Sequence, residues 1–472
     1  MKKGRVLKNI ILYGFIVVAT VLCFAGAYRV LSWKDTSGSD LSSLSQLYNT
    51  EKDLMDVVFV GSSHCYCGIY PPYFWEDAGI AAFDLSVSAQ DRISALHHLK
   101  ELLKTQSPKV VFFDVYGITY AEQMVVSNEY RNMLSMRQSV NSMELVAEYA
   151  PKEKWLDYWF RFPIIHGRYK ELKKTDFVTY APNRFGRGEL VNFRLNDSGI
   201  GELLSLEEFH PATLSADQTK WLEELTELSE KKGFQLVFYS APFYISQEAQ
   251  DQMDAVAVYA EENGIPMFDF NRMRDELGFD FYYDLQDPEH CNANGARKLA
   301  NFFEGYLAEN VALTDHRGDK RYWQWDQDLE WYRHVSTLDE LTREADPVEY
   351  ARILAQEKNY KVIISLEGSD FASIEGVDYP AALMEFGIAD EKGGKWLYED
   401  GKAVKVLENQ LDAAPYYVKL NNTDTVRLQY QGDYLFPENV MIGRQSYYNN
   451  GHRLLIIVYD ELLEKVVHCG YF

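Results

Sequence analysis

Residues that could cooperate in nucleophilic chemistry occur at two distant places in the chain. The segment VFVGSSHCYCG, residues 58–68, follows an apolar run with a glycine, two serines, a histidine and two cysteines. The segment DLQDPEHCNANGARKL, residues 284–299, places Asp287 three residues before His290. A serine hydroxyl attacks an acyl carbon when a general base is near it, and an imidazole oriented by a carboxylate is such a base. The two segments therefore predict one split site for acyl chemistry.

The elements that must bring these segments together are visible in the hydrophobic pattern. Short apolar runs of strand length alternate with longer amphipathic patterns typical of helices. The strand candidates are 56–60, 82–85, 109–115, 235–240 and 267–270, and the helix candidates are 92–105, 216–232 and 246–263. This alternation predicts a parallel sheet with helices on both faces. Because sites in such sheets lie at the carboxyl ends of the strands, both segments are expected at one edge.

Taken together and in order, the two segments resemble a known family. The Gly-Ser-Ser turn, the later Asp-x-x-His and the following Asn-x-x-Gly-Ala resemble the first and last blocks of the SGNH/GDSL hydrolase superfamily. The likeness is greatest to membrane-anchored bacterial cell-surface members, such as proteins of alginate-type O-acetylation and the D-alanyl transfer protein of teichoic acid modification. It covers residues 54–312 and implies an α/β fold with a three-layer, flavodoxin-like parallel sheet.

The resemblance also implies an activity. Ser63 would be the nucleophile, and Asp287 and His290 would complete the triad. The implied reaction is serine-dependent acyl transfer or acyl-ester hydrolysis, such as O-acetylation or deacetylation, on a cell-surface polysaccharide. No cofactor is expected, and a multipass membrane acyltransferase is a candidate partner.

The oxyanion-binding groups follow the family pattern less closely. The N–H of Ser63 and the second block would form the oxyanion hole, and the matching stretch FDLSVSAQ offers Ser86. The third block, Gly-x-Asn-Asp, is missing, and VFFDVYG stands in its place with Tyr116. We therefore list Ser86, His64 and Tyr116 as candidate oxyanion or substrate contacts. The missing block leaves an alternative, which is a non-catalytic surface module that binds glycan or recruits a membrane acyltransferase.

Three cysteines accompany the candidate site. Cys65 and Cys67 follow the serine turn, and Cys291 follows the histidine, so folding would bring them near His64. A zinc site in a metal-dependent enzyme is one interpretation, although the spacing differs from that of structural zinc sites. A disulfide from Cys65 or Cys67 to Cys291 is a second. We favour a third, in which the thiols are free, buried and act as small hydrophobic groups, and we expect no metal.

The N-terminus carries a membrane signal. Four basic residues within the first eight precede an uncharged apolar run at 10–27. Such a run can span a bilayer, and the basic flank places the N-terminus inside. We therefore predict a cytoplasmic tail and single-pass anchor over 1–33 with the bulk of the chain outside the cell. The small-x-small pattern Ala25-Gly26-Ala27 leaves a cleavable signal peptide as the alternative.

The rest of the chain suggests four further segments. A Ser-rich polar stretch at 34–53 predicts a stalk, and the mixed pattern at 117–205 predicts a helical insertion at the functional edge of the sheet. A charged, Trp-rich linker occupies 313–358, with a helix expected from 337 to 358. Residues 359–472 form a separate α+β, β-rich module of ordinary domain size.

This C-terminal module has its own resemblance. Strands are expected at 362–366, 426–430 and 454–459, and a helix at 379–386. The closing pattern, with Gly-x-x-Leu-Leu-Ile-Ile-Val-Tyr-Asp followed by a turn and Lys-Val-Val, resembles the interleukin-like EMT-inducer (PANDER-like) domain. The resemblance implies a compact β-sandwich-like fold with a carbohydrate-related role.

Charge excludes one class of partner. The 472-residue chain has a formal net charge of −24, and no Lys- and Arg-rich stripe is present. Binding to a phosphate backbone depends on clustered cations that release counterions. We therefore expect no nucleic-acid partner.

Overall fold

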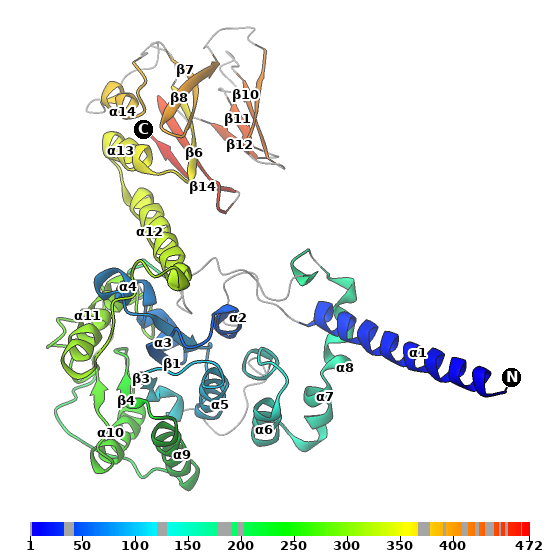
Figure 1. The fold of residues 1–472 in the computed structure, drawn as a ribbon. Helices are drawn as coiled ribbons and strands as arrows, with labels where there is room; N and C mark the ends of the chain where they lie inside the picture. Colours follow the sequence, from blue (N-terminus) through cyan, green and yellow to red (C-terminus); the bar gives the residue numbers. More distant parts are fainter. Residues whose placement is uncertain are drawn as a thin grey trace. The chain divides into compact units, whose positions relative to one another are not determined.

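The computed structural model describes residues 2–472 apart from 33–41, 120–129, 173, 178–190, 197, 199–202, 367–377, 390–392, 408–413, 421–423, 430–438, 443–444, 449–451 and 464. The chain divides after Tyr332 into two compact units, and each is described by itself. The first carries the predicted α/β domain and the N-terminal helix, and the second carries the C-terminal module (Figure 1).

A five-stranded parallel sheet forms the centre of the first unit. The strands are β1 (Val57–Gly61), β2 (Ala82–Ser86), β3 (Val110–Asp114), β4 (Gln235–Ser240) and β5 (Met267–Asp269). Their order is β2-β1-β3-β4-β5, with every pair parallel. This is the flavodoxin-like order, whose topological switch point lies beside β1. All five predicted strands and the α/β fold class are confirmed.

The helices begin and end at residues suited to capping. They include α5 (Arg92–Leu102), α9 (Ala216–Lys232), α10 (Gln247–Glu262) and α11 (Ala293–Asn310). The Asp91 carboxylate accepts the N–H groups of Ile93 and Ser94 at the start of α5, and Ser215 forms a capping box at the start of α9. Gly233 ends α9 in the left-handed region, where glycine is favoured. The three predicted helices are confirmed.

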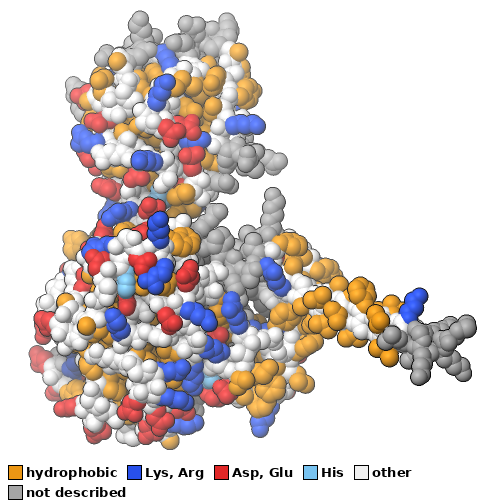
Figure 2. All heavy atoms as spheres, in the orientation of Figure 1, with side chains coloured by type: hydrophobic (Ala, Val, Ile, Leu, Met, Phe, Trp, Pro, Cys, Tyr) orange, Lys and Arg blue, Asp and Glu red, His pale blue; other side chains and the backbone are white. Residues whose placement is uncertain are grey.

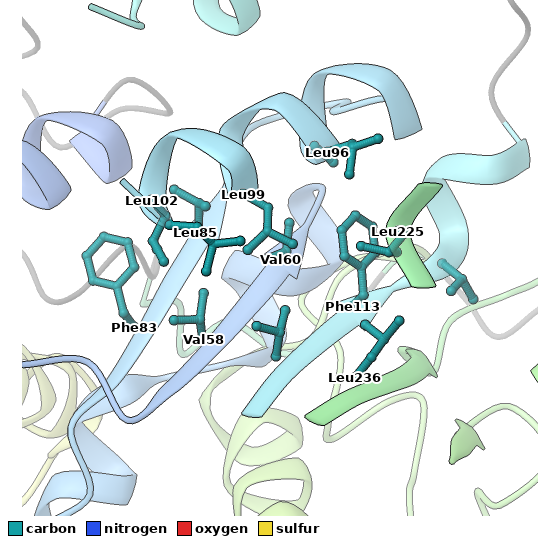
Figure 3. Close-up of a cluster of buried hydrophobic side chains, with 14 of the residues drawn as sticks. Val58, Val60, Phe83, Leu85, Leu96, Leu99, Leu102, Phe113, Leu225 and Leu236 are labelled. Carbon is teal, nitrogen blue, oxygen red and sulfur yellow. The ribbon is translucent and has the colours of Figure 1, made fainter. Parts of the chain in front are cut away.

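Alternate residues of the strands face opposite cores. Val58 and Val60 of β1 pack among side chains of α5 and α9, as Figure 3 shows for Leu99 and Leu225. Val57 and Phe59 face the other side, where the ring of Phe59 lies 5.2 Å from that of Phe303 on α11. Helices therefore cover both faces, and the apolar strands are buried on both, as parallel sheets require.

The predicted stalk is wrong from residue 42 onward. Residues 42–49 form α2 (Ser42–Asn49), and Leu44 and Leu47 on it are each 1% exposed, in the same hydrophobic core as Leu99 of α5. The pair lies three residues apart on one helix face, so burial of that face outweighs the polar composition of the segment. Residues 34–41 of the predicted stalk lie outside the described part.

The described parts of the predicted insertion are mainly helical up to Phe177, whereas residues 191–196 and 203–205 form neither helix nor strand. The helical segments are the end of η1 (Val115–Thr119), then η3 (Tyr130–Leu134), α6 (Val140–Tyr149), η4 (Lys152–Lys154), α7 (Trp155–Phe160), α8 (Phe162–Ile165), η5 (His166–Lys170) and η6 (Lys174–Phe177).

The N-terminal helix α1 (Lys2–Leu31) contains a segment, Lys8–Leu31, that is long and apolar enough to cross a membrane. By composition alone this segment suits either an anchor or a signal peptide.

The predicted helix over 337–358 is wrong in its extent. After η7 (Lys320–Tyr322), helix α12 (Trp323–Arg343) ends inside the predicted range, and a separate helix, α13 (Pro347–Gln356), follows it. Proline has no N–H and cannot continue a helix interior, but it suits the first helical position. The side chain of Asp346 caps the new helix by accepting the N–H groups of Val348 and Glu349.

The second unit is a β-sandwich with helices on one side. One sheet joins β6 (Tyr360–Leu366), β7 (Gly394–Glu399), β8 (Lys402–Leu407), β13 (Leu454–Asp460) and β14 (Lys465–Tyr471), and the other joins β9 (Tyr416–Lys419), β10 (Thr425–Gln429), β11 (Asn439–Ile442) and β12 (Gln445–Tyr448). All pairs are antiparallel. Ile363 and Ile457 share a core with Val426 and Val440 of the second sheet. Helices α13 and α14 (Tyr379–Glu385) pack on the opposite face. The predicted β-rich module is confirmed.

Candidate active site

Ser63 lies directly after strand β1, at the carboxyl edge of the sheet. Gly61 ends β1, Ser62 is the N-cap residue, and Ser63 is the first residue of α3 (Ser63–Gly68). A Cβ on Gly61 would come within 2.6 Å of the Cβ of Asp114 and 2.9 Å of the Cβ of Cys65. Only glycine therefore allows β1 to turn this tightly into α3. The first backbone N–H groups of the helix have no acceptor within it and point toward the edge.

His290 and Asp287 lie at the tip of a closed loop before α11. A bridge between Leu285 and Cys291 closes the loop, and the N–H of Gln286 donates to the carbonyl of His290 at 2.9 Å. The Asp287 carboxylate accepts the N–H groups of Glu289 and His290 at 2.9 and 3.0 Å. The same carboxylate therefore shapes the turn that carries the imidazole.

The structure brings Ser63, His290 and Asp287 into one hydrogen-bonded chain. The Nε2 atom of His290 lies 2.9 Å from the Oγ of Ser63, and Nδ1 lies 2.9 and 3.0 Å from the two carboxylate oxygens of Asp287. With its proton on Nδ1, the imidazole donates to the carboxylate and leaves Nε2 to accept the serine proton. This is the arrangement of a nucleophile, a general base and an orienting carboxylate. Ser63 and His290 are both partly exposed, so a substrate can reach them.

Asn292 and Gly295 explain the motif that follows the histidine. The side-chain oxygen of Asn292 accepts the N–H groups of Asn294 and Gly295 at the start of α11. Its amide donates to the backbone carbonyls of Arg194, Tyr283 and Leu285. A Cβ on Gly295 would collide with the carbonyl oxygen of Asp284. These two residues therefore hold the histidine loop against the helix.

His64 and Tyr116 lie together beside this hydrogen-bonded chain. Their rings stack with centroids 4.2 Å apart, and His64 also lies 4.5 Å from Phe243 and 5.6 Å from His290. Burial, and secondarily the charge of His290, lowers the pKa of His64 to about 3. His64 is therefore neutral at physiological pH. The structure brings both candidates to the site, where their contact with substrate stays a prediction.

Ser86 lies at the end of β2, in register with Gly61, but its hydroxyl is already engaged. It donates to the carboxylate of Asp84, which also accepts from the Sγ of Cys65 at 3.4 Å. A second buried carboxyl, Asp114 at the end of β3, accepts the N–H of Tyr116 at 3.1 Å. The side chain of Ser86 is thus directed at Asp84, and its role as an oxyanion donor stays a prediction.

The two buried carboxyls were not foreseen as part of the site. Asp84 and Asp114 are 0% and 1% exposed, on the strands that flank β1. Burial raises the pKa of Asp84 to about 8 and that of Asp114 to about 7. The available signal was an acidic residue inside an otherwise apolar strand, which is unusual unless the carboxyl is paired or neutral.

The cysteines near the site are buried free thiols. Cys65, Cys67 and Cys291 are all buried, and none of them is in a disulfide. Burial raises the pKa of each thiol well above its ordinary value. Over the described residues no group of three or more His, Cys, Asp or Glu side chains is arranged to hold a metal ion.

A pocket of about 220 Å³ lies next to His64 and the loop that carries His290. Phe243, which contacts His64, lines it, and the N–H of neighbouring Tyr244 donates to the carbonyl of Pro288 in the histidine loop at 2.9 Å. Its other walls include apolar Leu203 and the cationic side chain of Arg274. This pocket was not predicted, because its walls come from three separate segments of the chain, within 203–206, 243–247 and 271–281.

No protein-family model and no curated protein sequence matches the chain. Among solved structures, it is similar to an acetyl xylan esterase with a TM-score of 0.28 and 12% identity, over 54% of this chain and 100% of that one. It is also similar to a Bacteroides fragilis protein with a proposed acylhydrolase activity, with a TM-score of 0.30 and 12% identity, over 59% of this chain and 100% of that one. Both similarities concern the fold, and at these scores neither identifies an activity of this chain.

Proposed function

We propose that the protein is an SGNH-type esterase or O-acyltransferase that works through an acyl-Ser63 intermediate. The observation that supports this most directly is the chain of hydrogen bonds from Ser63 through His290 to Asp287. In the first half-reaction the Oγ of Ser63 bonds to the acyl carbon while His290 takes the serine proton. The carboxylate of Asp287 stabilises the imidazolium, which then protonates the departing alcohol oxygen as the ester bond breaks.

The acceptor decides the second half-reaction. Water or a sugar hydroxyl gives its proton to His290 and attacks the acyl carbon. The imidazolium then returns that proton to the Oγ of Ser63 as the bond between Ser63 and the acyl carbon breaks. Water makes the protein an esterase, and a sugar hydroxyl in a dry cleft makes it a transferase. The N–H of Ser63 at the start of α3 is the oxyanion donor we propose, because negative charge is stabilised at that position.

The substrate we propose is an acylated polysaccharide at the cell surface. Two features of the chain favour it, namely an apolar helix α1 that can anchor the protein in the membrane and a β-sandwich unit that resembles a carbohydrate-related domain. The pocket lined by Phe243 and Arg274 is the proposed place for the acyl group or the adjoining sugar. A multipass membrane acyltransferase is the proposed source of the acyl group in the transferase case.

Labelling with a serine-reactive fluorophosphonate tests the nucleophile. We expect labelling of the wild type and of the Ser62→Ala variant, but not of Ser63→Ala. Ser62 is the matched control because its buried hydroxyl has no hydrogen-bond partner among the described residues. We expect Asp287→Asn to slow labelling and ester turnover by about 10²- to 10⁴-fold. Equal labelling of Ser63→Ala and wild type would favour the non-catalytic surface module instead.

A further inference from the structure

The end of α1 is bound to the helical insertion, although the two are far apart in the sequence. The guanidinium of Arg168 on η5 donates to the carbonyls of Leu31 and Ser32 at 2.7 and 2.9 Å, and it pairs with Asp176 at 2.7 Å. A cation at the carboxyl end of a helix satisfies its last carbonyls and its dipole. Leu31 is 9% exposed at this junction, whereas the preceding residues of α1 are largely exposed.

A second contact with the insertion lies nearer the N-terminus of α1. The ring of Phe24 lies 6.0 Å from that of Phe160 and 5.0 Å from that of Phe162, at the corner between α7 and α8. The corner residue Arg161 is buried, and its guanidinium donates to the carbonyls of Met133, Leu134 and Met136. The two phenylalanines are therefore held in place against α1 by a fixed part of the insertion.

The position of Phe24 gives the depth of this contact. At 1.5 Å per residue, Phe24 lies about 10 Å along the helix axis before Leu31. Counting about 20 residues from Lys8 at the inner boundary places the outer boundary of the hydrocarbon core near Tyr28. Phe24 thus lies about 6 Å inside that boundary. If α1 crosses the bilayer, Phe160 and Phe162 lie at the depth of the outer acyl chains.

The insertion exposes apolar side chains next to this contact. Figure 2 shows hydrophobic side chains gathered over the insertion beside the base of α1. The exposed fractions are 75% for Leu156, 54% for Phe160, 62% for Tyr169 and 62% for Phe177, and we call these four residues the insertion's apolar surface. Exposed apolar groups that continue from a membrane-spanning helix mark a surface that contacts lipid or protein.

The composition of the insertion favours lipid over protein. Residues 152–177 contain seven Lys and Arg against four Asp and Glu, in a chain that has 47 basic and 71 acidic residues overall. The guanidiniums of Arg161 and Arg168 already bond backbone carbonyls and Asp176, and the remaining five basic residues are lysines. The indole rings of Trp155 and Trp159 lie 5.2 Å apart within the same stretch. Basic side chains attract anionic headgroups, and tryptophan is enriched at the membrane interface.

We propose that α1 is retained and that the insertion's apolar surface lies in the outer leaflet of the membrane that α1 crosses. The α/β domain is then held against the bilayer by two elements, a spanning helix and an interfacial helical segment. One helix alone leaves a domain free to rotate about its axis, whereas the second contact fixes which face of the domain meets the lipid.

Photo-crosslinking of the full-length chain in its native membrane tests this proposal. The variants are Leu156→benzoylphenylalanine and Phe177→benzoylphenylalanine. The control is Phe209→benzoylphenylalanine, because Phe209 is 52% exposed in the same unit but lies outside the insertion. Mass spectrometry identifies each adduct as phospholipid or polypeptide. The thermal unfolding temperature of each variant verifies that it is folded.

We expect phospholipid adducts at positions 156 and 177 at least about tenfold above those at position 209, since only lipid-facing positions meet acyl chains. Adducts at the level of the control would overturn the proposal, as would release of α1 from the mature chain. Polypeptide adducts in place of lipid would also overturn it, and would show that a membrane protein covers the surface. None of these readouts depends on Ser63, so they stand apart from the test of the enzyme.

Discussion

At the residue scale, two buried carboxyls lie on the strands next to the turn at residues 61–63. Neither has a cationic partner among the described contacts. Asp84 and Asp114 flank β1, and each retains one oxygen with no hydrogen-bond partner among the described residues. A charged carboxylate is expensive to bury, so burial favours the protonated form. At pH 7 Asp84 is thus mostly protonated, and Asp114 is about half protonated.

This arrangement predicts how stability depends on pH. In the unfolded chain an aspartate ionises near pH 4, whereas burial raises the pKa of Asp84 to about 8 in the folded protein. Between these values the folded state holds the proton that the unfolded state has lost, so the free energy of unfolding falls as pH rises from about 4 to 8. In the wild type this fall in the free energy of unfolding is on the order of a few kcal/mol, and we expect Asp84→Asn not to show it.

Urea unfolding at pH 5, 7 and 9 measures this effect. The matched control is Asp275→Asn, because Asp275 is exposed. Parallel pH profiles for the wild type and Asp84→Asn would contradict the assignment of a raised pKa to this carboxyl.

At the element scale, the loop before α11 determines where His290 lies. Gly295 allows the carbonyl of Asp284 to approach α11, and we expect Gly295→Ala to push the loop outward. The predicted loss is about 1–3 kcal/mol of stability, with slower ester turnover because His290 moves from Ser63. Gly305→Ala in the same helix is the control, since a Cβ there meets nothing within 4 Å, and it should stabilise by about 0.5–1 kcal/mol.

Thermal unfolding and aryl-ester turnover of the two variants check this prediction together. If Gly295→Ala matched the wild type in both, the loop would tolerate the extra carbon, and Gly295 would have no part in positioning His290.

Sequence reasoning succeeded where the pattern was local. The alternation of apolar runs predicted all five strands, and the ordered motifs predicted the residues that the structure brings together as Ser63, His290 and Asp287. It failed where tertiary packing decides. The Ser-rich stretch forms helix α2 because Leu44 and Leu47 are buried in a hydrophobic core. The direction of the Ser86 hydroxyl depends on a buried neighbour, Asp84.

At the scale of the whole molecule, the two units have separate hydrophobic cores. The second unit also contains a buried hydrogen bond, in which His334 Nε2 lies 2.7 Å from the carboxylate of Asp460, both almost fully buried. Removing the carboxylate takes this hydrogen bond from a buried imidazole nitrogen, which destabilises by about 1–3 kcal/mol. We therefore expect Asp460→Ala to lower the melting transition of the second unit alone.

Calorimetry resolves whether the two transitions are separate, and ester turnover reports on the first unit. Loss of turnover, or a single transition that shifts as a whole, would show that the folding of the two units is coupled.

The most direct test of Ser63 as the nucleophile is to trap the acyl-enzyme. The full-length protein is mixed with an aryl acetate, quenched in acid and digested, and the peptides are examined by mass spectrometry. We expect an acetyl group on Ser63 in the wild type and in Ser62→Ala, less of it in His290→Ala, and none in Ser63→Ala. Turnover of the ester by the wild type without acetyl-Ser63, or equal turnover by Ser63→Ala, would contradict a mechanism through this residue.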